Sequence, residues 1–386
     1  MNISYILNEL GEERDNYFNA IAPPIVQTSN FAFNSVADFR AALGDEYDKN
    51  IYSRANNPTI NILRKKLAAL DGAEDAMVFG SGVAAIAVPV IALLQSGDHV
   101  VCVENPYSWT IKLFTKLLPR FGVTCTFING TDTANFENAL QANTKLIYLE
   151  SPNTFSYELQ DIAAVAQLAK SKGIITMMDN SYCSPLYQQP IKLGIDLVAQ
   201  SATKYLGGHS DVVAGVLTGS RTLLKKVFEL EHMNIGAGMA PQTAWLLIRG
   251  LRTLPLRLQR SFETCQKVTA WLQQHPAVDK VVWPFMPGFK QAELACRQMQ
   301  GCGGLFSFTL KEPSIKKIEV FCDALQHILM AVSWGGHESL VIPAIATIPV
   351  ADYSLDNPRH QLIRMYVGLE DAEYLIGDLE QALGEL

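Results

Sequence analysis

The segment that decides the fold is Leu197-Val198-Ala199-Gln200-Ser201-Ala202-Thr203-Lys204, where a short apolar run ends in two hydroxyl side chains and a lysine. Such runs, when bounded by polar residues, are typical of strands buried on both faces. Similar runs alternate along the chain with helical patterns, and the strand candidates are residues 76–79, 99–103, 123–128, 146–149, 174–178, 197–200 and 213–217. This alternation predicts an α/β fold with a mainly parallel sheet and helices on both faces.

The pattern changes twice along the chain. Residues 1–50 lack a strong periodic element and contain Pro23-Pro24, which disfavours helix, so we expect an N-terminal arm there. Residues 51–240 hold the alternating pattern and predict a large α/β domain. Residues 241–386 predict a smaller α+β domain. Its expected elements are helices over residues 244–258, 261–275 and 371–383 and a strand over residues 304–310.

Composition excludes several classes of protein. With 386 residues, 48% of them hydrophobic and 18% charged, the chain reads as globular rather than disordered. The 31 Lys and Arg against 38 Asp and Glu give a formal charge of -7, so neither nucleic acid nor an anionic membrane is an expected partner. The longest strongly apolar run, residues 84–94, is too short to span a bilayer.

The N-terminus and the cysteines indicate the compartment. The first 16 residues are acidic and carry no apolar stretch, so no secretory signal is visible and a cytoplasmic location is expected. The seven cysteines contain no C-x-x-C pair, which argues against a disulfide framework or a thiolate zinc site. No bound metal is expected.

Three polar features follow predicted strands. Gly80-Ser81-Gly82-Val83 precedes a helical pattern, where glycines and unpaired N–H groups suit a phosphate. Asp179 could hold a protonated ring nitrogen, and Lys204 could form an imine while Ser201 and Thr203 donate to phosphate oxygens. Taken singly, each has an ordinary alternative as a turn, a cap or a surface lysine. Together they supply what pyridoxal phosphate requires.

Motifs over nearly the whole chain point the same way. They are Gln27-Thr28-Ser29, residues 52–59, Gly97-Asp98, Leu149-Glu150-Ser151-Pro152, Asp179-Asn180-Ser181, residues 201–211, residues 249–254, residues 333–340 and residues 368–371. The sequence resembles the Cys/Met-metabolism pyridoxal-phosphate enzymes, which include cystathionine β-lyase, cystathionine γ-synthase, cystathionine γ-lyase and methionine γ-lyase. The resemblance implies the aspartate-aminotransferase-like fold, fold type I, with a large cofactor domain and a smaller C-terminal domain.

The resemblance also implies roles for individual residues. Lys204 would carry the internal aldimine and then act as the base at Cα, and Tyr107 would stack on the cofactor ring and act as a second acid or base. The residues expected to bind cofactor are Tyr52, Arg54, Ser81, Gly82, Val83, Tyr107, Thr154, Asp179, Ser201, Thr203 and Lys204. Ser333, Trp334 and Arg364 are expected at the substrate, with Arg364 on its α-carboxylate.

Tyr52 and Arg54 imply an oligomer. In the family, this pair reaches the cofactor phosphate of a neighbouring subunit. We therefore expect a homodimer with shared active sites, assembled within a tetramer. Apart from further copies of the chain, the expected partner is a small amino-acid substrate.

Different motifs in the sequence favour different reactions within the family. Residues 333–340 resemble bacterial β-lyases, whereas residues 52–59 are closer to the γ-synthase and γ-lyase side. Trp109 replaces a small residue usual in γ-lyases and would narrow the pocket if it points inward. The leading hypothesis is a carbon–sulfur lyase, cystathionine β-lyase, that forms homocysteine, pyruvate and ammonia. The alternatives are cystathionine γ-synthase, cystathionine γ-lyase or methionine γ-lyase, and, less favoured, an aminotransferase or a cofactor-binding protein without catalysis.

Overall fold

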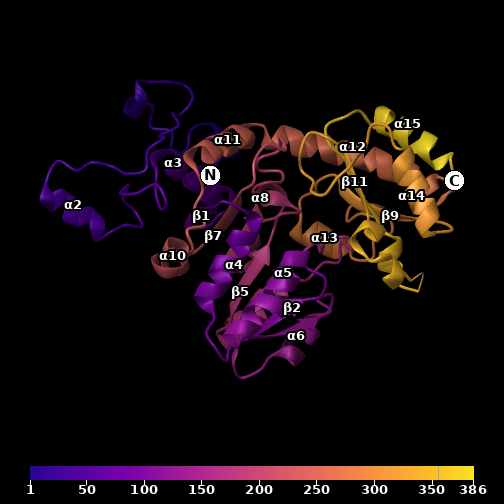
Figure 1. Ribbon diagram of the computed structural model, residues 1–386, viewed down its shortest axis with the longest axis horizontal. Coiled ribbons are helices and arrows are strands. Elements are labelled where there is room, and N and C mark those ends of the chain that lie inside the picture. The colour runs from indigo at the N-terminus through magenta and orange to yellow at the C-terminus, as the bar shows by residue number, and fades with distance from the viewer. Residues whose placement is uncertain (355) are drawn as a thin grey trace.

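The computed structural model describes residues 1–354 and 356–386, built around two β-sheets (Figure 1). The larger sheet has the strand order β1-β7-β6-β5-β4-β2-β3. Its strands are β1 (Asp75–Phe79), β2 (His99–Val103), β3 (Thr124–Ile128), β4 (Thr144–Glu150), β5 (Ile175–Asp179), β6 (Leu197–Ser201) and β7 (Gly215–Gly219). Only β7 runs against its neighbours. The predicted mainly parallel sheet and its seven strands are confirmed.

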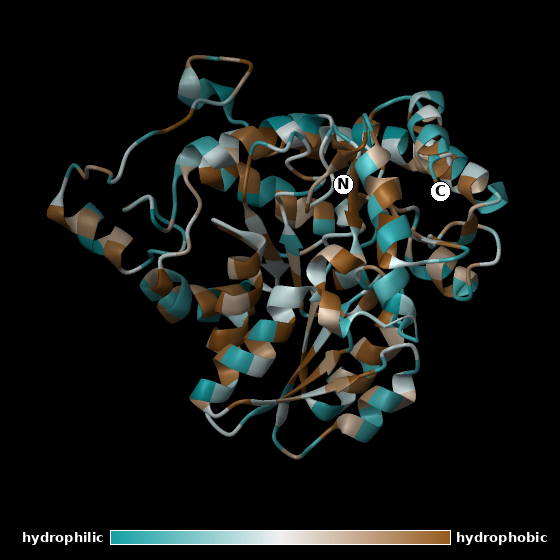
Figure 2. Cartoon of the chain, turned by 45° about the vertical axis from the view of Figure 1, so that its right-hand side comes forward, coloured by the Kyte–Doolittle hydropathy of each residue, from teal (hydrophilic) through white to brown (hydrophobic). Residues whose placement is uncertain are grey.

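Helices cover both faces of this sheet because its strands are apolar on both sides. Val100 and Cys102 of β2 pack in the cluster that contains α4 (Gly82–Leu93). Val101 and Val103, which alternate with them, pack in the cluster that contains α7 (Ile162–Lys172). Figure 2 shows the strands of the sheet as mostly hydrophobic and the outer helices as mixed. This period of two with both faces buried explains why the strands appear as continuous apolar runs.

The remaining helices differ in length, and the longest are α12, with 21 residues, and α3, with 14. They are α1 (Ile3–Asn8), α2 (Val36–Leu43), α3 (Pro58–Asp71), α5 (Ser108–Lys112), α6 (Thr133–Ala139), α8 (Ser184–Tyr187), α9 (Arg221–Val227), α10 (Met233–Ile235), α11 (Pro241–Arg252), α12 (Leu254–Gln274), α13 (Ala292–Gln298), α14 (Ile315–Ala324) and α15 (Ala372–Leu383). The prediction of one helix over residues 244–258 is wrong. That region divides at Thr253, because Pro255 lacks the N–H of a helix interior and starts a new first turn.

The N-terminal arm contains two helices that its sequence pattern did not predict. α1 packs against α3 and α11 with Ile6 and Leu7 buried, whereas α2 projects from the body (Figure 1). Behind α1, the buried Glu12 carboxylate lies 3.0 Å from Lys66 Nζ and 2.9 Å from Arg252 Nη2. This ion cluster attaches the arm to α3, which carries Lys66, and to α11, which carries Arg252.

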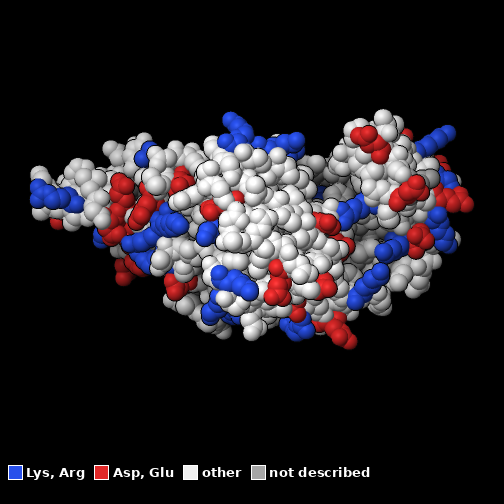
Figure 3. All heavy atoms as spheres, turned by 90° about the horizontal axis from the view of Figure 1, so that it is seen from below, with Lys and Arg blue, Asp and Glu red and all other residues white. Residues whose placement is uncertain are grey.

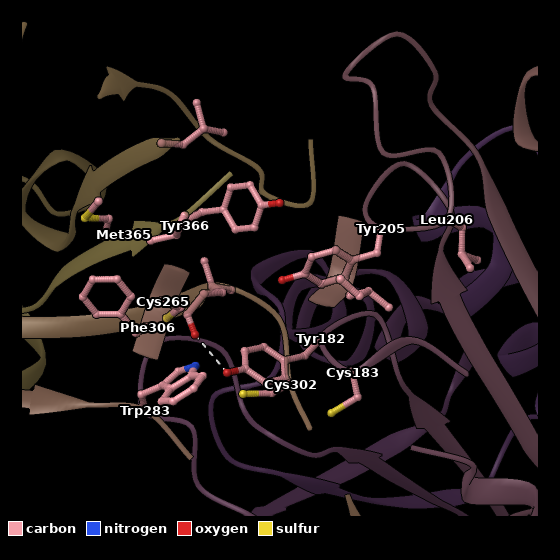
Figure 4. Close-up of a cluster of buried hydrophobic side chains, with 14 of the residues drawn as sticks. Tyr182, Cys183, Tyr205, Leu206, Cys265, Trp283, Cys302, Phe306, Met365 and Tyr366 are labelled. Atoms are coloured by element: carbon pink, nitrogen blue, oxygen red, sulfur yellow. Dashed lines mark hydrogen bonds between the residues drawn. The ribbon is translucent and has the colours of Figure 1, made fainter. Parts of the chain in front are cut away.

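The second sheet has the order β10-β11-β12-β9-β8. Its strands are β8 (Val278–Val282), β9 (Leu305–Leu310), β10 (Leu329–Met330), β11 (Leu340–Pro343) and β12 (Ile363–Tyr366). An aromatic cluster joins it to the first sheet, and Figure 4 shows Tyr182 bonded across this cluster. The Tyr182 hydroxyl donates to the Leu305 carbonyl at 2.9 Å. At Gly303 a Cβ would lie 1.8 Å from the Tyr205 hydroxyl, so only glycine fits there.

Within residues 1–354 and 356–386 none of the helices combines the length and apolarity that a bilayer crossing needs. On the face shown in Figure 3, basic and acidic side chains are interspersed.

Candidate active site

The polar features predicted at strand ends meet in one cavity. Its volume is about 210 Å³, and it opens where β1, β4, β5 and β6 end. The predicted site residues that line it are Ser81, Gly82, Val83, Tyr107, Thr154, Asp179, Ser201, Thr203, Lys204 and Trp334. Ligands of open α/β sheets bind at the carboxyl ends of strands, as found here.

One end of the cavity is the start of α4. Ser81 caps this helix by accepting from the Ala84 N–H at 3.1 Å. A Cβ on Gly82 would lie 2.8 Å from both Cβ and Oγ of Ser201, so glycine is what lets the helix approach the end of β6. The unpaired N–H groups of the first turn, beside the Ser201 hydroxyl, form a cradle suited to a phosphate.

Two hydroxyls at this end are already engaged by the protein. Thr203 Oγ1 donates to the Ala214 carbonyl at 3.2 Å and accepts from the Ala214 N–H at 3.0 Å. Ser181 Oγ accepts from the Ser201 N–H at 2.6 Å. Thr203 therefore fixes its own loop against the residue before β7, and the Ser201 hydroxyl is the freer donor toward the cavity.

Asp179, the last residue of β5, lies in the cavity wall. Its Oδ1 accepts from the Ser181 N–H at 2.8 Å. Burial raises the pKa of this carboxyl, opposed by the bonds from Ser181 and by the charge of Lys204. A carboxylate in such a place requires a cationic or N–H partner, and a protonated ring nitrogen would satisfy it.

Lys204, Ser333, Trp334 and Arg364 come together in a second group, of which Lys204 and Trp334 line the cavity and Ser333 and Arg364 lie against them outside its lining. Lys204 Nζ donates to Ser333 Oγ at 2.5 Å and lies 4.4 Å from the Trp334 ring centroid. Arg364 Cζ lies 5.2 Å from the same ring and 4.8 Å from that of Phe155. Burial, with a contribution from Arg364, lowers the pKa of Lys204 to about 8, although Asp179 opposes the shift.

Ser333 is held in a strained backbone conformation. Its φ is +90°, a region that non-glycine residues rarely adopt. Its carbonyl oxygen lies 3.5 Å from Arg364 Nη2, while its side chain meets Lys204. A strained backbone conformation persists only where the surrounding contacts hold it. For Ser333 these contacts include Lys204 at its hydroxyl and Arg364 at its carbonyl oxygen.

Glu150 is a residue of the cavity wall that sequence reasoning missed as a site residue. Its carboxylate accepts from the N–H groups of Tyr107 at 2.6 Å and Thr154 at 2.9 Å. Burial, and then the charge of Asp179, raise the pKa of Glu150 to about 8. Its position at a strand end within the Leu149-Glu150-Ser151-Pro152 motif was the signal that could have identified it.

Three residues singled out in the sequence lie elsewhere. Neither Tyr52 nor Arg54 lines the cavity formed by the described residues; Arg54 Cζ lies 5.3 Å from the ring of Tyr52, which is 48% exposed. Trp109 is 52% exposed and stacks with Lys112 Nζ at 4.1 Å. Within a single chain, Trp109 thus does not narrow the cavity.

The donor set fits pyridoxal phosphate. The helix start that only Gly82 allows suits the phosphate, the buried Asp179 suits a protonated ring nitrogen, and the amine of Lys204 in the same cavity suits an imine. The phenol of Tyr107 lines the same cavity.

Comparison with known proteins agrees with this geometry. The family model described as Cys/Met metabolism PLP-dependent enzyme matches residues 6–384. L-methionine gamma-lyase of Treponema denticola is 36% identical over 96% of this chain and 94% of its own. Cystathionine gamma-lyase of Macaca fascicularis is 36% identical over 97% and 91%. Cystathionine beta-lyase MetC of Bacillus subtilis is 37% identical over 96% and 94%. The resemblance, the fold-type-I architecture and the cofactor are therefore confirmed, and the chain belongs to the Cys/Met metabolism family of pyridoxal-phosphate-dependent enzymes.

Proposed function

We propose that this enzyme is a carbon–sulfur lyase of sulfur amino-acid metabolism, and specifically a cystathionine β-lyase. The observation that carries the proposal is the contact of Lys204 with Ser333 beside Trp334 and Arg364. It supports the proposal because an amine of lowered pKa then lies beside two side chains that could bind an amino-acid carboxylate. The residue block that supplies Ser333 and Trp334 is the one that resembles bacterial β-lyases.

Lys204 would be the residue to which the cofactor is attached and the base that removes the Cα proton. With a pKa of about 8, roughly a fifth of its free amine is neutral near physiological pH, far more than for an ordinary lysine. Ser333 Oγ, 2.5 Å away, would hold that amine in place while it is free. When bound, pyridoxal phosphate supplies an electron-poor ring that stabilises negative charge at the substrate Cα.

Arg364 and Trp334 would bind the substrate α-carboxylate. Arg364 is buried on β12, where its guanidinium can bind a carboxylate through two parallel hydrogen bonds. Trp334 Nε1 is buried and has no hydrogen-bond partner among the described residues, so it is available as a further donor. The two side chains stack at 5.2 Å, which fixes the direction of both sets of donors.

Tyr107 would protonate the departing sulfur. Burial, and then the charges of Asp179 and Glu150, raise the pKa of its phenol, so the phenol keeps its proton at neutral pH and is a hydrogen-bond donor and acid for sulfur as the Cβ–S bond breaks. In β-elimination the Cβ–S bond breaks and its electron pair leaves with sulfur, which takes up this proton as homocysteine. Asp179 would pair with the cofactor ring nitrogen, Thr154 would lie near the ring oxygen, and Ser81, Gly82, Val83, Ser201 and Thr203 would hold the phosphate.

The placement of Tyr52 and Arg54 supports a shared active site. Both lie outside the cavity of their own chain, and Tyr52 is exposed, as expected for residues that serve the phosphate of a neighbouring copy. We propose a homodimer within a tetramer, in the cytoplasm. We further propose that the chain divides into the arm (1–50), the cofactor domain (51–240) and the C-terminal domain (241–386).

The test is to incubate the purified holoenzyme with L-cystathionine and identify the products. Pyruvate with homocysteine is expected. The alternative is γ-elimination, because relatives of similar identity are named gamma-lyases. That reaction would give 2-oxobutyrate with cysteine, and these products would overturn the β assignment. Lys204→Ala should abolish either reaction, and full activity in that variant would refute the catalytic assignment.

A further inference from the structure

We propose that Glu150 is a positioning residue that sets the orientation of Tyr107 and of the Thr154 loop against the cofactor. The inference rests on the proposed role of Tyr107 at the cofactor ring. Glu150 ends β4 directly opposite Asp179 at the end of β5, so it lies in the cavity wall, one strand away from the proposed ring-nitrogen site. Its side chain is buried, with 7% of the residue exposed.

One carboxylate joins two loops. Glu150 Oε2 accepts from the Tyr107 N–H at 2.6 Å, and Oε1 accepts from the Thr154 N–H at 2.9 Å. Tyr107 follows β2 and immediately precedes α5, whereas Thr154 follows β4. The two loops therefore share a single anchor on the strand between β2 and β5.

A second bond supports the same junction. Asn153 Nδ2 lies 3.3 Å from the Glu104 carbonyl, and its Oδ1 accepts from Gln160 Nε2 at 2.8 Å. The bond from Asn153 to Glu104 connects the loop after β4 to the first residue after β2. Glu150 makes the connection at the residue whose phenol lines the cavity.

The arrangement specifically needs a carboxyl group, whose two oxygens can both accept in the charged and in the neutral form. Two N–H donors converge on the side chain, so both of its oxygens must accept. In Glu150→Gln one oxygen becomes an NH₂ group, which faces a backbone N–H and cannot bond to it. The variant keeps the size of the side chain but releases either Tyr107 or Thr154.

The experiment compares wild-type holoenzyme with Glu150→Gln. We expect a changed visible-region circular dichroism of the bound cofactor, because that signal reports how the ring lies in its surroundings. We also expect kcat for L-cystathionine to fall by ~10-fold, which corresponds to one lost buried hydrogen bond, with a smaller change in KM. Glu150→Asp, which keeps two acceptors, should recover part of the kcat that Gln loses.

Asp378→Asn is the matched control. Asp378 is also buried and also accepts backbone N–H groups, from Gln326 at 2.8 Å and from His327 and Ile328 at 2.9 Å, but it lies in α15 away from the cavity. It should lower the melting temperature and leave the cofactor dichroism unchanged.

Three outcomes would overturn the inference. In the first, Glu150→Gln has the dichroism and kcat of wild type. In the second, its dichroism and kcat change no more than those of an Asp378→Asn protein that has lost the same amount of melting temperature. In the third, the effects of Glu150→Gln and Tyr107→Ala on kcat simply add in the double variant. If Lys204→Ala is inactive in the same assays, such results refute the role of Glu150 and leave the proposed function standing. If Lys204→Ala is fully active, the proposed function itself fails.

Discussion

Removal of the Lys204 charge should change how the stability of the apoprotein depends on pH. In Lys204→Met the side chain keeps its length and apolar stem but loses the ammonium. Burial, and then Arg364, lower the pKa of Lys204 from an ordinary value of 10.5 to about 8, with Asp179 opposing them. Because one pH unit corresponds to about 1.4 kcal/mol, the charged lysine should destabilise the fold by about 3 kcal/mol.

The direction follows from the two protonation states. Below pH 8 the lysine is charged in both the folded and the unfolded chain, so the folded state carries the whole penalty. Above pH 8 the folded state holds a neutral amine while the unfolded chain still binds a proton, and stability rises with pH until about 10.5. Between pH 7 and 9.5, wild type should gain about 2 kcal/mol relative to Lys204→Met.

Urea unfolding of the apoproteins at pH 7, 8, 9 and 9.5, at one protein concentration, measures this difference. Glu150 is present in both proteins, so its own titration largely cancels. The lost bond to Ser333 adds an offset that does not depend on pH. Lys116→Met, at an exposed lysine, is the control and should parallel wild type. A wild-type minus Lys204→Met difference that stays constant over this range would refute the reasoning.

Two further substitutions test the two ends of the cavity. In Gly82→Ala the new Cβ would lie 2.8 Å from Ser201 Oγ and push α4 from β6. The Kd for pyridoxal phosphate, measured by absorbance titration, should therefore rise at least ~10-fold. An unchanged Kd would contradict the close approach of α4 to β6. Arg364→Lys loses the two parallel N–H donors that can bind a carboxylate. The kcat/KM for L-cystathionine should fall by ~100-fold, mainly through a higher KM, while the cofactor absorbance is preserved. An unchanged KM would show that Arg364 does not bind the substrate carboxylate.

The residues at strand ends could be predicted because a local pattern locates them. A doubly buried strand is a continuous apolar run, and the first polar residue after it marks the edge of the sheet. Asp179 and Lys204 were found this way, and both line the cavity. Their roles at the cofactor stay predictions until the variants are measured.

Features that depend on distant contacts could not be predicted. The strand-end position of Glu150 marks it as a site residue, but its partners are backbone N–H groups, one of them 43 residues away, and the sequence pattern does not identify backbone donors. α1 is short, and its two buried residues are explained only by packing and by the Glu12 cluster beside it. The break at Thr253 was missed because apolar residues continue at helical spacing across it.

The bond between Tyr182 and Leu305 has a consequence for the order in which the site is assembled. Asp179, Tyr182 and Lys204 leave the ribosome early, but Leu305, which both lines the cavity and holds the Tyr182 hydroxyl, follows about 120 residues later. The residues that face Lys204 come later still. A nascent chain therefore displays the reactive lysine before Leu305 and Trp334, which complete the cavity wall, have been synthesised. Productive capture of the cofactor is expected only after synthesis is complete, when the last third of the chain closes the cavity.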